Sequence, residues 1–301
     1  MNRSFSGVFP ILVTAFTRDG DLDIASQLRI ADHLLEQGAH GLGVFGNAGE
    51  GYALLPREKR SLLDAIVRHV DGRVALVVGV GATGTAAAVE ACRVAAGQGA
   101  SALMVLPPYY LRPDADGLLF FYDAISEAVD VPIMVQDAPM LSQVAMPPAL
   151  LARLAREVAC VEYAKVEAPP TAPKVGKTLE ACAGDLTLFG GLNGQFLIEE
   201  FQRGARGTMP ASDMTSYFVS VWNALEEGRP ESAWQAFTRA LPLIRFELQP
   251  GLGVSAVKHN LVHRGIMRSA FVRHPTRSLD RAGLRELAAL RTLVWPDRYP
   301  C

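Results

Sequence analysis

Short runs of apolar residues recur along the chain at fairly even intervals, and most are followed by a stretch with helical periodicity. The runs, which predict eight strands, are 7–16, 41–46, 74–80, 102–107, 131–137, 160–165, 186–191 and 205–210. Their near-continuous apolar character is typical of strands buried on both faces, as in a parallel sheet. Between them, apolar residues at the spacing of an amphipathic helix occupy 23–38, 55–72, 84–100, 114–130 and 147–158.

Eight strands alternating with helices predict an α/β fold, a (β/α)8 TIM barrel. A doubly wound open sheet is the alternative, but it explains the strand count less well. Helical patterns continue at 217–228, 230–248, 254–265 and 281–294, which is more helix than a barrel needs. We therefore expect the barrel within 1–212 and a C-terminal group of helices, 213–301, packed on it.

Composition and charge narrow the class of partner. A formal net charge of -2 gives no sign of a nucleic-acid or membrane-surface partner. The cysteines are scattered without a C-x-x-C pair, and the histidines lack ligand spacing, so we predict no metal site. No stretch reaches the roughly 18 apolar residues of a membrane helix. The chain is expected to be cytoplasmic.

A glycine pattern at 79–84, "GVGATG", matches the G-x-G-x-x-G fingerprint of dinucleotide-binding folds. That fingerprint also requires an acidic residue about 20 positions further on, where this chain reads "MVLPPYY". The stretch "GLGVFG" at 41–46 matches the same pattern inside a predicted strand. We interpret both as tight turns at strand ends that line the barrel mouth, and we predict no cofactor.

Lysine is scarce in the chain, yet Lys165 stands at the end of the predicted strand in "VEYAKVEA". Active sites of such barrels lie at the C-terminal ends of the strands. If Lys165 points inward, alternation predicts that Tyr163 and Val161 do so too. An enclosed amine loses hydration, which disfavours its charged form, and a neutral amine can form a Schiff base with a carbonyl compound. The alternative is an ion pair of Lys165 with Glu162 or Glu167.

Other strand ends add polar groups to the same rim. The second strand ends in "GNAGEG" at 46–51, a turn that can aim backbone N–H groups at an anion such as a carboxylate. The fourth ends in "PPYYLRP", where the hydroxyl of Tyr110 could relay protons. Gly191 and Met209, at the ends of the seventh and eighth predicted strands, are expected to contact the substrate as well.

These pieces together resemble the dihydrodipicolinate synthase / N-acetylneuraminate lyase family of class I aldolases. The motifs that carry the resemblance are "GNAGEGYALLPREK", "GVGATGTAAAVE", "PPYYLRP" and "EYAKVEA". It implies a barrel with C-terminal helices, a homotetramer, and Lys165 as the lysine that forms a Schiff base with a 2-oxo acid such as pyruvate. It further implies that Gly46, Asn47 and Ala48 bind the carboxylate. Tyr110 matches a relay tyrosine that reaches a neighbouring subunit's site.

Departures from the family pattern bear on the reaction. Gln136 in "VQDAP" replaces the family's second tyrosine, and glutamine cannot transfer a proton at neutral pH. Asn47 and Ala48 stand where two hydroxyl residues are usual. Leu141 stands near the position of an arginine that grips a second carboxylate in the lysine-pathway synthases. The synthase activity is therefore not favoured.

The segments "VPIMVQDAP", "LARLARE" and "VRHP" are similar to a narrower branch, the dehydratases of 2-keto-3-deoxy sugar acids such as L-2-keto-3-deoxyarabonate. The resemblance thus favours dehydration of such an acid, with Gln136 among the residues that bind it. A carbon–carbon lyase or synthase of the same family is one alternative. A barrel that binds a 2-oxo acid without catalysis is another, and Lys165 at the strand end argues against it.

Overall fold

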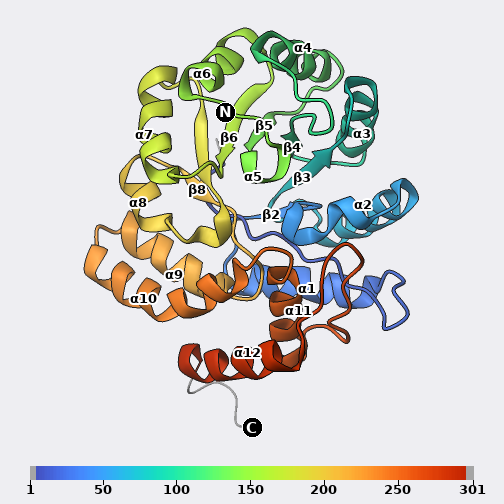
Figure 1. Ribbon diagram of the computed structural model, residues 1–301, viewed down its shortest axis with the longest axis vertical. Coiled ribbons are helices and arrows are strands. Elements are labelled where there is room, and N and C mark those ends of the chain that lie inside the picture. The colour runs from blue at the N-terminus through green and yellow to red at the C-terminus, as the bar shows by residue number, and fades with distance from the viewer. Residues whose placement is uncertain (1–4, 296–301) are drawn as a thin grey trace.

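The computed structural model describes residues 5–295 and contains a single eight-stranded parallel sheet rolled into a barrel (Figure 1). The strands, in chain order, are β1 Gly7–Val8, β2 Gly41–Val44, β3 Ala75–Gly81, β4 Ala102–Leu106, β5 Ile133–Asp137, β6 Val161–Val166, β7 Thr187–Gly190 and β8 Gly207–Thr208. From β2 onward each strand pairs in parallel with the next, and β8 pairs with β1. The predicted (β/α)8 barrel is confirmed.

Helices surround the strands. In chain order they are α1 Ile24–Glu36, α2 Pro56–Val70, α3 Thr85–Gly97, α4 Ala115–Ser126, the short α5 Pro139–Ser142, α6 Pro148–Glu157, α7 Thr171–Cys182 and α8 Leu197–Gln202. After β8 follow α9 Thr215–Glu226, α10 Pro230–Glu247, α11 Gly253–His263 and α12 Arg281–Val294. Within residues 5–295, no helix is long and apolar enough to cross a membrane.

The C-terminal helices divide into two groups by position. Helix α9 packs against β1 and α8, which is the place of the eighth helix of a barrel. Helices α10, α11 and α12 follow it, and in Figure 1 they lie together with α9 at one side of the barrel. The boundary predicted between 212 and 213 thus falls just before α9, and it stays a prediction about folding units.

The barrel closes where the extended segment after β1 meets β2. The N–H of Leu12 donates to Gly43 O at 2.8 Å, and Gly43 N donates to Pro10 O at 2.9 Å. Glycine is required at Gly43 because a Cβ there would lie 2.3 Å from Ile11 Cδ1. The glycines of "GLGVFG" thus make room for side chains that fill the barrel, and not for a nucleotide.

The first predicted strand is much shorter than its apolar run. Only Gly7–Val8 of 7–16 forms a regular strand, and Ile11 makes isolated bridges to Gly43 and Ala211. Pro10 lacks an N–H and therefore interrupts the regular ladder. The extended chain still passes along the barrel, so the residues are buried as the pattern predicted.

Strand β6 contains an irregularity that the sequence did not reveal. Ile133 pairs with Val161, but the next residue, Met134, pairs with Tyr163, so Glu162 is an extra residue, a β-bulge. Tyr163 lies among the side chains inside the barrel, whereas Val161 packs in the layer between strands and helices. The expectation that Val161 points inward with Lys165 is therefore wrong, because the bulge shifts the alternation by one residue.

Candidate active site

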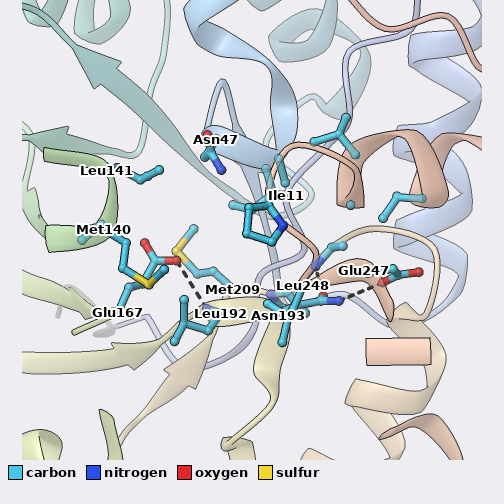
Figure 2. A pocket seen from close by; sticks show the side chains of 18 of the residues that line it. Ile11, Asn47, Met140, Leu141, Glu167, Leu192, Asn193, Met209, Glu247 and Leu248 are labelled. Carbon is cyan, nitrogen blue, oxygen red and sulfur yellow. Dashed lines mark hydrogen bonds between the residues drawn. The ribbon is translucent and has the colours of Figure 1, made fainter. Parts of the chain in front are cut away.

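A cavity of about 390 Å³ opens at the C-terminal ends of the strands. Its walls come from the barrel and from the loop between α10 and α11 (Figure 2). Among the lining residues are Asn47, Leu141, Lys165, Glu167, Asn193 and Met209. A cavity of this size suits a small organic acid.

Lys165 lies in this cavity and is 5% exposed. It faces inward on the same side of β6 as Tyr163, as alternation predicts downstream of the bulge. Its Nζ lies 3.2 Å from Glu167 Oε1. The sequence alternative of an ion pair with Glu167 is thus present, and it coexists with access to the cavity, whereas Glu162 lies exposed at the other end of the strand.

The polar groups at this end of the cavity make their contacts with Glu167. Gln136 Nε2 donates to its Oε2 at 3.0 Å, and the backbone N–H of Leu192 donates to its Oε1 at 3.3 Å. A Cβ on Gly191 would lie 2.3 Å from Glu167 Cγ, so only glycine fits there. Gly191 therefore positions Glu167, and it is not among the residues that line the cavity.

The turn after β2 supplies unused backbone donors. Gly46 ends the extended segment, and Asn47–Gly49 forms one turn of 3₁₀ helix. In the described part of the chain, the N–H groups of Asn47 and Ala48 donate to no other group, and both residues line the cavity. A carboxylate is the natural acceptor for two such N–H groups.

Opposite the turn, Asn193 and Glu247 form a polar part of the wall (Figure 2). Asn193 Nδ2 donates to Glu247 Oε2 at 2.8 Å, and its Oδ1 accepts from Ala211 N at 2.8 Å. Burial raises the pKa of Glu247 well above its ordinary value, and the charge of the neighbouring Asp213 raises it further. Sequence reasoning missed both residues.

Much of the remaining wall is apolar. Met209, one of the predicted contacts, lies at the base with Ile11, and Met140 and Leu141 lie at one side (Figure 2). Lys165 is the one cationic side chain among the described lining residues. Leu141, expected near the position of an arginine in the lysine-pathway synthases, thus lies on a side of the cavity where the described lining residues carry no positive charge.

Tyr110 lies outside the cavity. It is 81% exposed on the loop after β4, and it contributes nothing to the cavity of its own chain. Its neighbour Tyr109 lines a second cavity of about 460 Å³ between α2, α3 and β3. The expected role of Tyr110 in a neighbouring subunit's site stays a prediction.

The glycine fingerprint at 79–84 has a packing explanation. A Cβ on Gly79 would lie 2.7 Å from the carbonyl oxygen of Phe45, so glycine lets β3 pass close to the turn after β2. Gly84 is the N-cap residue of α3. Within residues 5–295, no group of three or more His, Cys, Asp or Glu side chains is arranged to hold a metal ion.

Comparisons with known proteins agree with this architecture. The model of the dihydrodipicolinate synthetase family matches residues 4–292. L-2-keto-3-deoxyarabonate dehydratase from Azospirillum brasilense is 33% identical, over 96% of this chain and 94% of the dehydratase. 4-hydroxy-tetrahydrodipicolinate synthase from Corynebacterium aurimucosum is 32% identical, over 96% of this chain and 93% of the synthase. The crystal structure of dihydrodipicolinate synthase from Rhodopseudomonas palustris superposes with a TM-score of 0.90 at 30% identity, over 96% of this chain and 97% of that one.

Proposed function

Because the chain belongs to the dihydrodipicolinate synthetase family, we propose that it is a Schiff-base-forming lyase that dehydrates a 2-keto-3-deoxy sugar acid. Family membership supports a lyase or aldolase type of enzyme acting on a small 2-oxo acid. The observation that carries the finer proposal is the pairing of Lys165 with Glu167 at one end of the cavity.

The substrate's carboxylate would lie on the turn after β2. The N–H groups of Asn47 and Ala48 offer two donors there, and neither needs a side-chain hydroxyl. The 2-oxo group next to the carboxylate then faces Lys165. Asn193, on the polar part of the wall, is available to the hydroxyl groups of the sugar chain.

Glu167 suits the role of acid and base. Its Oε1, at 3.2 Å from Nζ, can take a proton from the amine and so free the lone pair that attacks C2. Loss of water from the carbinolamine gives the imine. The same carboxylate would then remove a proton from C3, which converts the imine to an enamine. The C4–O bond then breaks, with the proton returning to the departing hydroxyl as water. Hydrolysis frees Lys165 and the dehydrated 2-oxo acid.

Two features favour dehydration over carbon–carbon cleavage. Retro-aldol cleavage requires a base on the C4 hydroxyl, and Gln136, in the place of the family's tyrosine, can hold Glu167 but cannot accept that proton. The synthase reaction brings in a second carboxylate, and the described lining residues offer no cation for it besides Lys165. The synthase or another carbon–carbon lyase is the second candidate, since a synthase is almost as similar in sequence as the dehydratase.

The test is borohydride reduction with pyruvate and with 2-keto-3-deoxyarabonate, followed by mass mapping of the modified peptide. We expect an adduct on Lys165 that is absent from Lys165→Ala, and release of water from the sugar acid without formation of pyruvate. Pyruvate release would establish the carbon–carbon lyase instead. Absence of any adduct with both compounds would leave a barrel that binds without catalysis.

The assembly is part of the same proposal. Tyr110 and Leu111 are exposed together on the loop after β4, 81% and 78% respectively. A homotetramer in which this loop meets a second copy would cover them. Sedimentation of the intact protein, compared with that of Leu111→Asp, tests this arrangement: the variant should dissociate to smaller species, and unchanged sedimentation would contradict it.

A further inference from the structure

Two carboxyl groups lie buried behind the polar wall of the cavity. Asp213 belongs to the turn between β8 and α9, and Glu247 is the last residue of α10. Asn260 Nδ2 donates to Asp213 Oδ2 at 2.5 Å and to Glu247 Oε1 at 3.1 Å, so the two carboxyl groups lie side by side on one amide nitrogen. Two ionised carboxylates so close together in a buried site would repel strongly, which favours one proton held between them. The pair therefore carries one negative charge.

The groups that face the pair are fixed in charge. Arg264, after α11, donates through Nη1 to Asp213 O at 2.8 Å, and Arg291 of α12 donates through Nε to Asn260 Oδ1 at 2.7 Å. His259 and His263 of α11 lie near Arg291, and burial with that charge lowers the pKa of both. Neither histidine therefore gains charge as pH rises, whereas burial raises the pKa of both carboxyls of the pair.

The turn in front of the pair is held in an unusual backbone conformation. Leu192 and Asn193 have φ values of 47° and 52°, in the left-handed region that residues with a side chain seldom adopt. Such residues persist only where their surroundings hold them. Here the side chain of Asn193 does so, bridging Glu247 Oε2 and Ala211 N.

This turn reaches the reactive end of the cavity. In it the N–H of Leu192 donates to Glu167 Oε1 (Figure 2). The same oxygen lies 3.2 Å from Lys165 Nζ. A continuous series of contacts thus runs from Asp213 through Asn260, Glu247, Asn193, the Leu192 N–H and Glu167 to Lys165.

We propose that the Asp213/Glu247 pair positions Glu167 for its work on Lys165, by locking the Leu192–Asn193 turn, and that it does so only while one proton is shared within the pair. Neither residue touches the reacting atoms, so both are positioning residues. Loss of the shared proton leaves two negative charges in contact in a buried site, where they repel strongly. Glu247 then moves away from Asp213. Asn193 loses its hydrogen bond to Glu247, and the turn is no longer held in place.

The inference rests on the proposed function, because positioning matters only if Lys165 reacts. Two readouts separate the two claims. The first is borohydride trapping of pyruvate on Lys165, followed from neutral to alkaline pH. The second is the hydrogen-exchange protection of the peptide that contains Leu192, corrected for the intrinsic effect of pH, which needs no substrate.

Three variants of the intact chain sharpen the test. Asp213→Asn keeps the single negative charge and supplies an N–H donor to Glu247, so both readouts should remain high into the alkaline range, where the wild type loses them. Glu247→Leu removes the acceptor of Asn193, so trapping and protection should fall about tenfold at every pH. Glu200→Gln is the matched control: it removes a buried carboxyl bonded to Thr171 and not to Asn193, and the alkaline loss should persist.

Thermal unfolding checks that each variant is folded. The comparison of Asp213→Asn with the wild type remains decisive even if Glu247→Leu does not fold. Equal pH dependence of both readouts in Asp213→Asn and the wild type would overturn the inference, as would normal protection in Glu247→Leu. The protection of the Leu192 peptide could change in the variants as expected while no adduct forms in the wild type. In that case the proposed function fails, and the positioning role fails with it.

Discussion

Two lysines of this chain are buried, and each faces a glutamate, yet their surroundings differ. Lys258 on α11 is fully buried, pairs with Glu50, donates to Phe271 O at 2.8 Å, and lies 4.5 Å from the centre of the Phe16 ring. Burial lowers the pKa of Lys258 to about 8, and Glu50 offsets part of that. Lys165 has Glu167 as its ion-pair partner and borders the cavity.

The comparison teaches that burial and an ion pair do not by themselves identify a reactive lysine. Lys258 is enclosed on all sides, so no carbonyl compound can approach it, and its contacts join α11 to the turn after β2. Lys165 keeps one side open to the cavity, and its partner can exchange a proton with it. We therefore expect the first pair to serve stability and the second, under the proposed function, to serve chemistry, and mutation can separate the two roles.

The largest effect should come from Lys165→Ala. Removal of the amine should abolish the borohydride adduct and reduce turnover at least about 10³-fold, because no other group can form the imine. The unfolding free energy should change little, since Glu167 keeps the donors Gln136 and Leu192 N. Turnover and urea unfolding of the same variant check both expectations. A large loss of stability would contradict the distinction between the two lysines.

Lys258→Met should give the opposite result. It leaves the fully buried carboxylate of Glu50 without its cation, which costs about 3–5 kcal/mol of unfolding free energy. The double variant Glu50→Gln/Lys258→Met should recover much of that loss, because it removes the unpaired charge. Urea unfolding of both proteins measures the difference. A double variant no more stable than the single would show that packing, and not charge, is what Lys258 supplies.

Glu167→Gln sharpens the comparison at the reactive lysine. The amide keeps the shape of the side chain but cannot take a proton, so turnover should fall about 10- to 100-fold. The rate of adduct formation, measured by rapid-quench trapping, should fall together with turnover. The thermal midpoint should stay close to that of the wild type. Unchanged adduct formation would assign the proton transfer to another group.

The smallest effect concerns the charges around the structural lysine. Arg273, whose N–H donates to Glu50, also holds Glu58 in a two-pronged pair with both contacts at 2.7 Å. This hydrogen bonding lowers the pKa of Glu58 to about 2. A carboxyl whose folded pKa is depressed adds stability that is complete above its unfolded value near 4.5 and is lost as pH falls towards 2.

Glu58→Gln should therefore cost about 1–2 kcal/mol at neutral pH, less than the full pKa shift implies because the pair is partly exposed. The difference from the wild type should shrink as pH falls from about 4.5 to about 2. Thermal unfolding across this range checks the sign. A constant difference would mean that Glu58 contributes through packing alone.

The features that the sequence predicted correctly are those set by residues close together in the chain. The strand that carries Lys165 and the glycine turn at 46–51 follow from short patterns, and the structure places both at the same rim. The bulge at Glu162 left no signal, since the pairing of β5 with β6 is decided by strands far apart in the chain. Val161 was therefore assigned to the wrong side.

The wall of the cavity escaped prediction for a similar reason. Asn193 and Glu247 meet across 54 residues of chain, and neither belongs to a recognisable motif. The left-handed conformation of Leu192 could not be expected either, because glycine is the residue that usually marks such positions. The sequence suggests Glu167 only as an ion-pair partner, because its hydrogen bonds to Gln136 and Leu192 depend on how distant segments meet in the fold.

The tie between Glu50 and Lys258 also has a consequence for how the protein is made. The two residues lie 208 positions apart, so the turn that presents Asn47 and Ala48 is synthesised long before its anchor. At about 5–20 residues per second, the delay on the ribosome is about 10–40 s. During that interval a nascent barrel carries an unpaired Glu50 and an unsecured turn. The last quarter of the chain, which contains Lys258, thus decides when the turn of a newly made molecule is held in place.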